Sequence, residues 1–337
     1  MSPPLTAPGK LLWMGGVSGY LLSRNLAFKH APRAANALMR LTNVSGRGRG
    51  RDGAAAVKYF RSVLADYENI ATESGLVRGG GSDGRDGRAL WKDRNVLELG
   101  PGNTKAIALG ARARGAASFA GWDAFDVQSR DHAYLDAIYG PMLEDLGEKG
   151  GLDRAEELLR GVSVHADAGP LRSAAAGRKF DLVISRAVLE HVRDLDRLYR
   201  ELDLLVADDA VLIHKVDLRC HGFRWNHELD FLMFSEPLWR GLTTHIGEPN
   251  RKRYPEYLAI GERYGFVPIY AASTHVIDAS EVDRVRTQLA EPYRSMDDDA
   301  LRTLGFWVVQ VRSSHPLAKK RATFPLPPAP HARLGSF

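Results

Sequence analysis

A short glycine-rich segment that follows an acidic residue is the first candidate for chemistry. It reads Glu98-Leu99-Gly100-Pro101-Gly102 and ends an apolar run that begins at Asn95. Glycine permits a sharp backbone turn and the close approach of a ligand. The helix expected directly afterwards offers free N–H groups and partial positive charge at its N-terminus. The segment therefore predicts a loop that binds a carboxylate or a phosphate.

Two more acids follow apolar runs. Asp123 lies 21 residues after Gly102, at the end of the run 118–122, and Asp167 follows the run 162–166. A carboxylate at the end of a second strand can accept hydrogen bonds from two ribose hydroxyls. Asp167 is similarly placed to accept from an adenine amino group. A helix cap or a turn is the structural alternative for both residues.

The glycine spacing disfavours two common nucleotide ligands. A dinucleotide-binding loop needs Gly-x-Gly-x-x-Gly, and its third glycine would fall on Lys105. The chain also lacks a Walker phosphate-binding pattern. We therefore expect neither NAD nor a nucleoside triphosphate at this loop.

The elements that must position these residues alternate between strands and helices. Apolar runs predict strands at 95–99, 118–122, 162–166, 180–185, 210–218, 266–276 and 306–312. Helical spacing predicts helices over 54–75, 104–114, about 130–160 with breaks near 140–141 and 150–151, and from Val188 to Leu205. This alternation is typical of an α/β, Rossmann-like doubly wound sheet. Such a sheet would place Gly100, Asp123, Asp167 and Ser185 around one crevice at the carboxyl ends of its strands.

Four segments in this order resemble the class I S-adenosylmethionine-dependent methyltransferases, in particular the type 11 group. They are residues 96–102, 121–123, 166–168 and 180–192, and the resemblance covers about residues 90–313. It implies a mostly parallel sheet with an antiparallel C-terminal strand and a helical lid insertion. It also implies S-adenosyl-L-methionine as the cofactor.

The resemblance assigns roles to eight residues. The glycine loop and Glu98 would hold the methionine end of the cofactor, Asp123 the ribose and Asp167 the adenine, with Ser185 and Arg186 beside the methionine. Thr104 stands where such loops often have a third glycine. The implied cofactor-binding set is Glu98, Gly100, Pro101, Gly102, Asp123, Asp167, Ser185 and Arg186.

Methyl transfer from a sulfonium needs alignment, and an oxygen acceptor also needs a general base. The candidates are His221, which follows the strand 210–218, and His191, which follows the strand 180–185. His214 lies within a strand, where a structural histidine is the simpler interpretation. His214, Asp217 and His221 also allow a metal cluster, but a strand followed by a turn gives no reliable ligand geometry, so we predict no metal.

Residues 219–262 are aromatic and charged and follow no simple period. We expect them to form the lid and acceptor region, although the same composition fits the core of a helical subdomain. Arg251 and Arg253 are either partners for an anionic acceptor or part of a solvated face.

The ends of the chain differ in charge from its middle. Residues 1–51 hold eight Lys/Arg and residues 300–337 hold six, with no acid in either, so the residues between carry a net charge of −9. Basic arms suit an anionic partner or a membrane surface, but they also serve as solubilising tails. Residues 11–22 fit a short surface-binding or core-docking helix, and no stretch is long and apolar enough to predict a transmembrane segment. A single cysteine, Cys220, favours a reducing, cytoplasmic location.

These observations predict four regions and one main function. The regions are a basic arm (1–52), a helix with a glycine-rich linker (53–89), a methyltransferase domain (90–316) and a Pro-rich basic tail (317–337), which we expect to be disordered. We expect methyl transfer to oxygen on a small-molecule or glycan/lipid-intermediate acceptor. The alternatives are an RNA or protein methyltransferase that uses the basic arms, and a non-catalytic cofactor-binding partner protein. The oligomeric state does not follow from the sequence.

Overall fold

The computed structural model describes residues 7–31, 53–77, 86–166, 169–175, 177–221, 224–243, 248–323 and 325–328. Asp167, the glycine-rich linker at 79–84 and the Gly-Arg repeat at 46–51 lie outside these residues.

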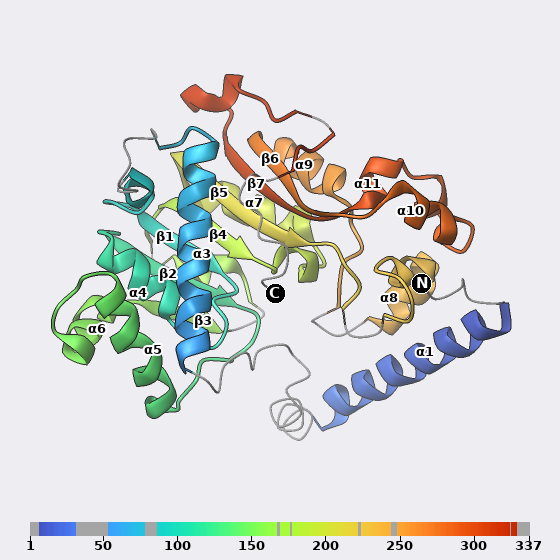
Figure 1. Cartoon of the computed structure of the whole chain (residues 1–337), viewed down its shortest axis with the longest axis horizontal. Coiled ribbons are helices and arrows are strands. Elements are labelled where there is room, and N and C mark those ends of the chain that lie inside the picture. The colour runs from blue at the N-terminus through green and yellow to red at the C-terminus, as the bar shows by residue number, and fades with distance from the viewer. Residues whose placement is uncertain are drawn as a thin grey trace.

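A seven-stranded sheet runs through the molecule (Figure 1). Its order is β3-β2-β1-β4-β5-β7-β6, with β1 to β5 parallel and β7 antiparallel to both β5 and β6. The strand order reverses between β1 and β4, where α/β sheets bind ligands. This arrangement confirms the predicted Rossmann-like fold and its antiparallel C-terminal strand. The strands are β1 (Asn95–Leu99), β2 (Ser118–Asp123), β3 (Ser163–Ala166), β4 (Phe180–Arg186), β5 (Val206–Asp217), β6 (Phe266–Val276) and β7 (Thr303–Arg312).

Helices cover both faces of the sheet because its strands are apolar on both sides. Helices α3 to α6 pack on one face, and α7 and α9 pack on the other. A third apolar cluster joins α1, α8 and α10 beyond the end of β5. The helices are α1 (Ala7–His30), α3 (Gly53–Glu73), α4 (Ala106–Ala113), α5 (His132–Asp145), α6 (Gly151–Leu159), α7 (Leu195–Leu205), α8 (Glu236–Leu242), α9 (Tyr254–Arg263), α10 (Ala279–Arg286) and α11 (Asp298–Arg302).

Two predicted helix boundaries are wrong. Helix α5 continues through Pro141, although a helix break was expected near residues 140–141. Proline leaves the Ala137 carbonyl without its helical N–H partner. Gly53, at the start of α3, packs against that carbonyl so closely that a Cβ at Gly53 would lie 2.9 Å from it.

The helix expected from Val188 begins only at Leu195, because residues 189–191 form a 3₁₀ turn.

The first part of the C-terminal tail is ordered, so the prediction of disorder is wrong for its described residues. Ser273 of β6 pairs with Pro328, and the Ala322 N–H donates to the Pro268 carbonyl at 2.9 Å. Leu326 is buried in the core of the α7–α9 face. The described residues of the tail therefore bind along the edge of the sheet at β6.

Candidate active site

The carboxyl ends of β1, β2 and β4 meet at one edge of the sheet. Leu99 pairs with Trp122 on one side and with Ser185 on the other. The Gly100 N–H donates to the Trp122 carbonyl at 2.8 Å, which fixes the first residue of the glycine loop beside β2. The loop, Asp123 and Ser185 therefore lie at the same edge, where the sequence predicted a crevice.

The two loop glycines are needed for different reasons. Both have positive φ, 69° at Gly100 and 72° at Gly102. A Cβ at Gly100 would lie 2.3 Å from the Val188 side chain, so packing after β4 excludes a side chain there. A Cβ at Gly102 would meet no atom within 4 Å. Gly102 thus opens onto free space, as a residue that approaches a ligand must.

Neighbouring residues hold the loop in place. Pro101 packs on β2 where only a glycine fits, because a Cβ at Gly121 would lie 2.9 Å from the Pro101 ring. The Gln128 side-chain amide donates to the Gly102 carbonyl at 2.6 Å, and the Ser129 N–H donates to the Asn103 carbonyl at 2.8 Å. The loop after β2 thereby fastens the glycine loop after β1.

Two carboxyl groups lie near each other on the adjacent strands that precede and flank this loop. Glu98 is buried, and burial together with the nearby Asp123 carboxylate raises the pKa of Glu98 to about 8. Asp123 also accepts a hydrogen bond from the Phe125 N–H at 3.0 Å, which orients its carboxylate. A ligand with positive charge and hydroxyl groups would relieve the repulsion between the two acids.

The side chains of Ser185 and Arg186 are bound within the protein. The Ser185 hydroxyl lies 2.8 Å from His214 Nδ1, and burial lowers the pKa of His214 to about 3, so that imidazole is neutral. Arg186 forms an ion pair with Asp66 of α3 at 2.7 Å, with its guanidinium over the Trp307 ring. With their side chains held in this way, Ser185 and Arg186 would contact a ligand through their backbone atoms at the end of β4.

Sequence reasoning missed the strained turn that follows Arg186. Ala187 has a φ of 53°, which is rare for a residue with a Cβ. Its N–H donates to the Lys215 carbonyl of β5 at 2.9 Å, which holds the turn. Such strain concentrates at functional sites. No sequence signal reveals it, because alanine is not a typical residue in this conformation.

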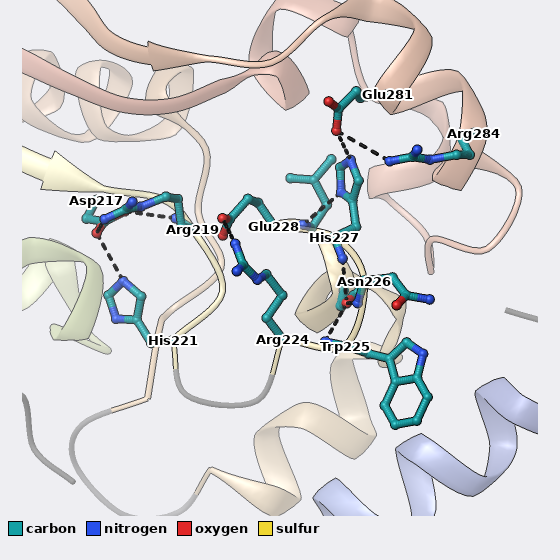
Figure 2. Close-up of polar contacts among 12 residues, drawn as sticks. Asp217, Arg219, His221, Arg224, Trp225, Asn226, His227, Glu228, Glu281 and Arg284 are labelled. Carbon is teal, nitrogen blue, oxygen red and sulfur yellow. Dashed lines mark hydrogen bonds and ion pairs between the residues drawn. The ribbon is translucent and has the colours of Figure 1, made fainter. Parts of the chain in front are cut away.

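The second group of polar residues lies at the ends of β4 and β5. The rings of His191 and His221 have centroids 5.0 Å apart. His221 Nε2 lies 3.4 Å from the Asp217 carboxylate, and Arg219 binds the same carboxylate through Nε and Nη2 (Figure 2). Burial opposes ionisation, but hydrogen bonds from His221 and Arg219 outweigh it and hold the pKa of Asp217 below its usual range.

Glu190 and Asn250 complete this group, and neither was singled out from the sequence. Glu190 is almost fully buried, and burial followed by the Asp217 charge raises its pKa well above the usual range. The Asn250 amide donates to the carbonyls of Leu189 and Val192, both at 2.9 Å. Asn250 therefore fixes the 3₁₀ turn that carries His191. The residues of this group are Glu190, His191, Asp217, Arg219, His221 and Asn250.

Neither of the two expectations for Arg251 and Arg253 is correct. Both residues are buried, at 1% and 0% exposure, and their guanidinium groups bind carbonyl oxygens. Arg251 donates to the carbonyls of Phe231 and Phe234, and Arg253 donates to four carbonyls that include Leu218. They hold the segment after β5 together and have no face for an acceptor. Among the residues that the structure describes, no three His, Cys, Asp or Glu side chains gather in a way that could hold a metal ion.

The sequence model of a family described as a methyltransferase domain matches residues 78–270, more than half of the chain. No curated protein matches the sequence.

Three of the solved structures that this chain resembles have sequences only 12–15% identical to it. One is a cyclopropane-fatty-acyl-phospholipid synthase-like protein from Lactobacillus casei, 14% identical with a TM-score of 0.44, covering 81% of this chain and 98% of that one. Another is an S-adenosylmethionine-dependent methyltransferase from Mesorhizobium loti, with 15% identity, a TM-score of 0.36, and coverage of 66% and 92%. The third is a TehB-like SAM-dependent methyltransferase from Corynebacterium glutamicum, with 12% identity, a TM-score of 0.34, and coverage of 82% and 96%.

Proposed function

Because this chain belongs to the methyltransferase domain family and uses S-adenosyl-L-methionine, we propose that it methylates an oxygen atom of a small-molecule or glycan/lipid-intermediate acceptor. One observation supports the proposed cofactor-binding site. The neighbouring carboxyl groups of Glu98 and Asp123 lie at the edge of the sheet where Gly102 opens onto free space.

The residues at this edge suit the cofactor by charge and shape. Glu98 would take the ammonium group of its methionine end, with the loop from Gly100 to Gly102 against the same portion, and Asp123 would accept from the ribose hydroxyls. When bound, S-adenosylmethionine supplies a methyl group already activated on a positively charged sulfur. Asp167 would accept a hydrogen bond from the adenine amino group, and the backbone at Ser185 and Arg186 would contact the methionine end of the cofactor.

His221 is the proposed general base, with His191 as the second candidate. An oxygen acceptor must lose a proton, and an imidazole held by a carboxylate can accept it. His221 presents Nε2 to Asp217, which leaves Nδ1 to receive the proton, and its side chain is 28% exposed, so an acceptor can reach it. Strand spacing puts the ends of β1 and β5 about 10 Å apart, a span that a methyl donor and an acceptor can fill.

The region 219–262 remains the proposed lid and acceptor region. Most of its aromatic residues are buried in apolar cores, which supports the helical-subdomain interpretation for them, whereas Trp225 is 56% exposed. The buried Cys220, the only cysteine of the chain, supports the proposal of a cytoplasmic location.

The cofactor site is tested by measuring thermal unfolding of the protein with S-adenosylhomocysteine, with NAD and with ATP. S-adenosylhomocysteine at a hundred times its Kd should stabilise the protein by about 2.7 kcal/mol, and the other two should not. Asp123→Asn should abolish most of that shift. Asp126→Asn, at a carboxylate 56% exposed, is the matched control and should retain it. Stabilisation by NAD would contradict the assignment.

The acceptor requires a separate screen. We expect one product from a panel of hydroxylated metabolites, glycans and lipid intermediates to gain the mass of one CH₂ per transfer. Methylation of RNA or protein alone would contradict the proposed acceptor class, and cofactor binding with no product from any panel would support the non-catalytic alternative.

A further inference from the structure

Helix α1 has one face packed on the protein and one face exposed. Trp13, Val17 and Leu21 are buried against the cluster formed by α8, α10 and the 3₁₀ turn at 230–233. The helix lies along the margin of the molecule, beside α8 and away from the sheet (Figure 1). The opposite face of α1 exposes four leucines: Leu11 at 71%, Leu12 at 78%, Leu22 at 49% and Leu26 at 57%. Tyr20, at the edge of the packed face, is 49% exposed.

Polar contacts fix which face points outward. Arg24 forms an ion pair with Glu248, the Lys10 ammonium donates to the Gln288 carbonyl at 2.7 Å, and the Asn25 amide donates to the Leu242 carbonyl at 2.6 Å. These contacts lie at both ends of the helix. The exposed leucines therefore cannot turn inward without breaking them.

The exposed face differs chemically from an ordinary surface helix. Solvent-facing helical residues are normally polar or charged. Here the exposed positions are mostly leucine, tyrosine and glycine, and a Cβ at Gly15, Gly16 or Gly19 would meet no other atom within 4 Å. The helix contains no acidic residue and ends with Lys29 and His30. Exposed leucines without neighbouring acids, on a helix that ends in positive charge, mark an interaction surface.

The charge distribution selects the partner. The first 51 residues hold eight basic and no acidic residues, whereas residues 52–299 carry a net charge of −9. We propose that the outer face of α1, defined by Leu11, Leu12, Leu22 and Leu26, binds the surface of an anionic phospholipid bilayer. The acidic body would be repelled from that surface, so the chain would bind with α1 toward the lipid.

Other partners fit less well. A second copy of this chain on the same face would bring two basic arms together, which like charges disfavour. A nucleic acid would gain little from exposed leucines, because its affinity comes from phosphate contacts. None of the described helices combines the length and the apolar character needed to cross a bilayer. The fitting geometry is a helix that lies in the plane of the interface.

Vesicle flotation of the full chain tests this proposal. We expect the protein to float with phosphatidylcholine vesicles that contain one-third phosphatidylglycerol and to bind pure phosphatidylcholine much more weakly. Raising sodium chloride from about 0.05 M to about 0.5 M should weaken the binding, because the Debye length shortens. Leu12→Ser/Leu26→Ser should lower the partition coefficient by about tenfold or more, because two apolar side chains leave the lipid.

The matched control is Leu152→Ser/Leu204→Ser, which changes leucines that are 41% and 67% exposed on α6 and α7. This control should float as the unmodified chain does. Circular dichroism and the stabilisation by S-adenosylhomocysteine show that both variants fold. Failure of the unmodified chain to float overturns the proposal. So does a dimer, seen by light scattering, that the α1 variant loses.

Discussion

The carboxyl group of Glu98 should couple cofactor binding to proton release. Its pKa of about 8 keeps it mostly protonated at neutral pH. A ligand that brings an ammonium group and a sulfonium favours the ionised form, so binding lowers this pKa and releases a proton. Affinity for S-adenosylmethionine should therefore rise between about pH 6 and pH 8, by up to tenfold per unit. Titration calorimetry in buffers of different ionisation enthalpy measures the release.

Glu98→Gln provides the control for this effect. The amide keeps the size of the side chain and cannot titrate, so the variant should bind with little proton release and a flatter pH dependence. Equal proton release by the variant and the unmodified protein would show that another group is responsible.

At the residue scale, the second prediction concerns His221, which lies just after β5. His221→Ala should lower kcat by about 10²- to 10⁴-fold for an oxygen acceptor, because no group remains to accept the proton. Binding of S-adenosylhomocysteine should not change. His132→Ala, an exposed histidine on α5, is the matched control.

Asp217→Asn separates a base from a positioning residue. Asp217 contacts His221 and not the acceptor in this interpretation, so its loss should shift the pH profile of kcat more than it changes binding. Full activity of His221→Ala would transfer the role to His191, whose own variant would then show the loss.

Among the elements, α3 contributes to the site in a way that the sequence does not reveal. The helix itself was predicted from its apolar spacing, but Asp66 pairs with Arg186 across 120 positions of the chain. Helical spacing reports which face is apolar and not which distant residue a polar side chain meets. The paired acids Glu98 and Asp123 were predictable for the opposite reason, since each lies at or next to the end of its strand and adjacent parallel strands end together.

The same contrast applies to the strands and to the tail. Apolar runs located all seven strands, because most of these strands are buried on both faces and leave a continuous signal. The order of the described tail residues was missed, because a proline-rich segment gains structure here by pairing with the edge at β6. Pairing between distant segments leaves no local pattern.

The packing of α3 on α4 yields a third prediction. A Cβ at Gly110 of α4 would lie 2.2 Å from a methyl group of Leu64 on α3, and Leu64 is fully buried. Gly110→Ala should therefore destabilise the protein by about 1–3 kcal/mol through overpacking, despite the better helix propensity of alanine. Chemical denaturation measures the change.

Leu64→Ala supplies the second arm of a double-mutant cycle. Alone, it should cost about 2–5 kcal/mol through the cavity that it leaves. In that background Gly110→Ala should become neutral or stabilising, because the clash is gone and the helix preference remains. Simple additivity of the two changes would show that the helices do not meet at this point.

For the whole molecule, the described part of the C-terminal tail should act as a structural strap and not as a dispensable extension. Leu326 is 7% exposed in the core on the face of the sheet that α7 and α9 cover. The Lys320 ammonium donates to the Ser74 carbonyl after α3 at 3.0 Å, and the Ser273 N–H donates to the Pro327 carbonyl at 2.8 Å. The strap therefore joins both faces of the sheet to β6. Ending the chain after residue 315 should lower Tm by about 4 °C or more, because burial of one leucine alone is worth about 2 kcal/mol.

Ending the chain after residue 328 removes Arg333 and keeps the strap, so it is the control. This shorter deletion should leave Tm unchanged, and Leu326→Ala in the full chain should reproduce roughly half or more of the loss seen with the longer deletion, since the apolar contact is its largest single part. Equal Tm for the two deletions would contradict the structural role, because residues 316–328 would then contribute no net stability to the sheet they extend.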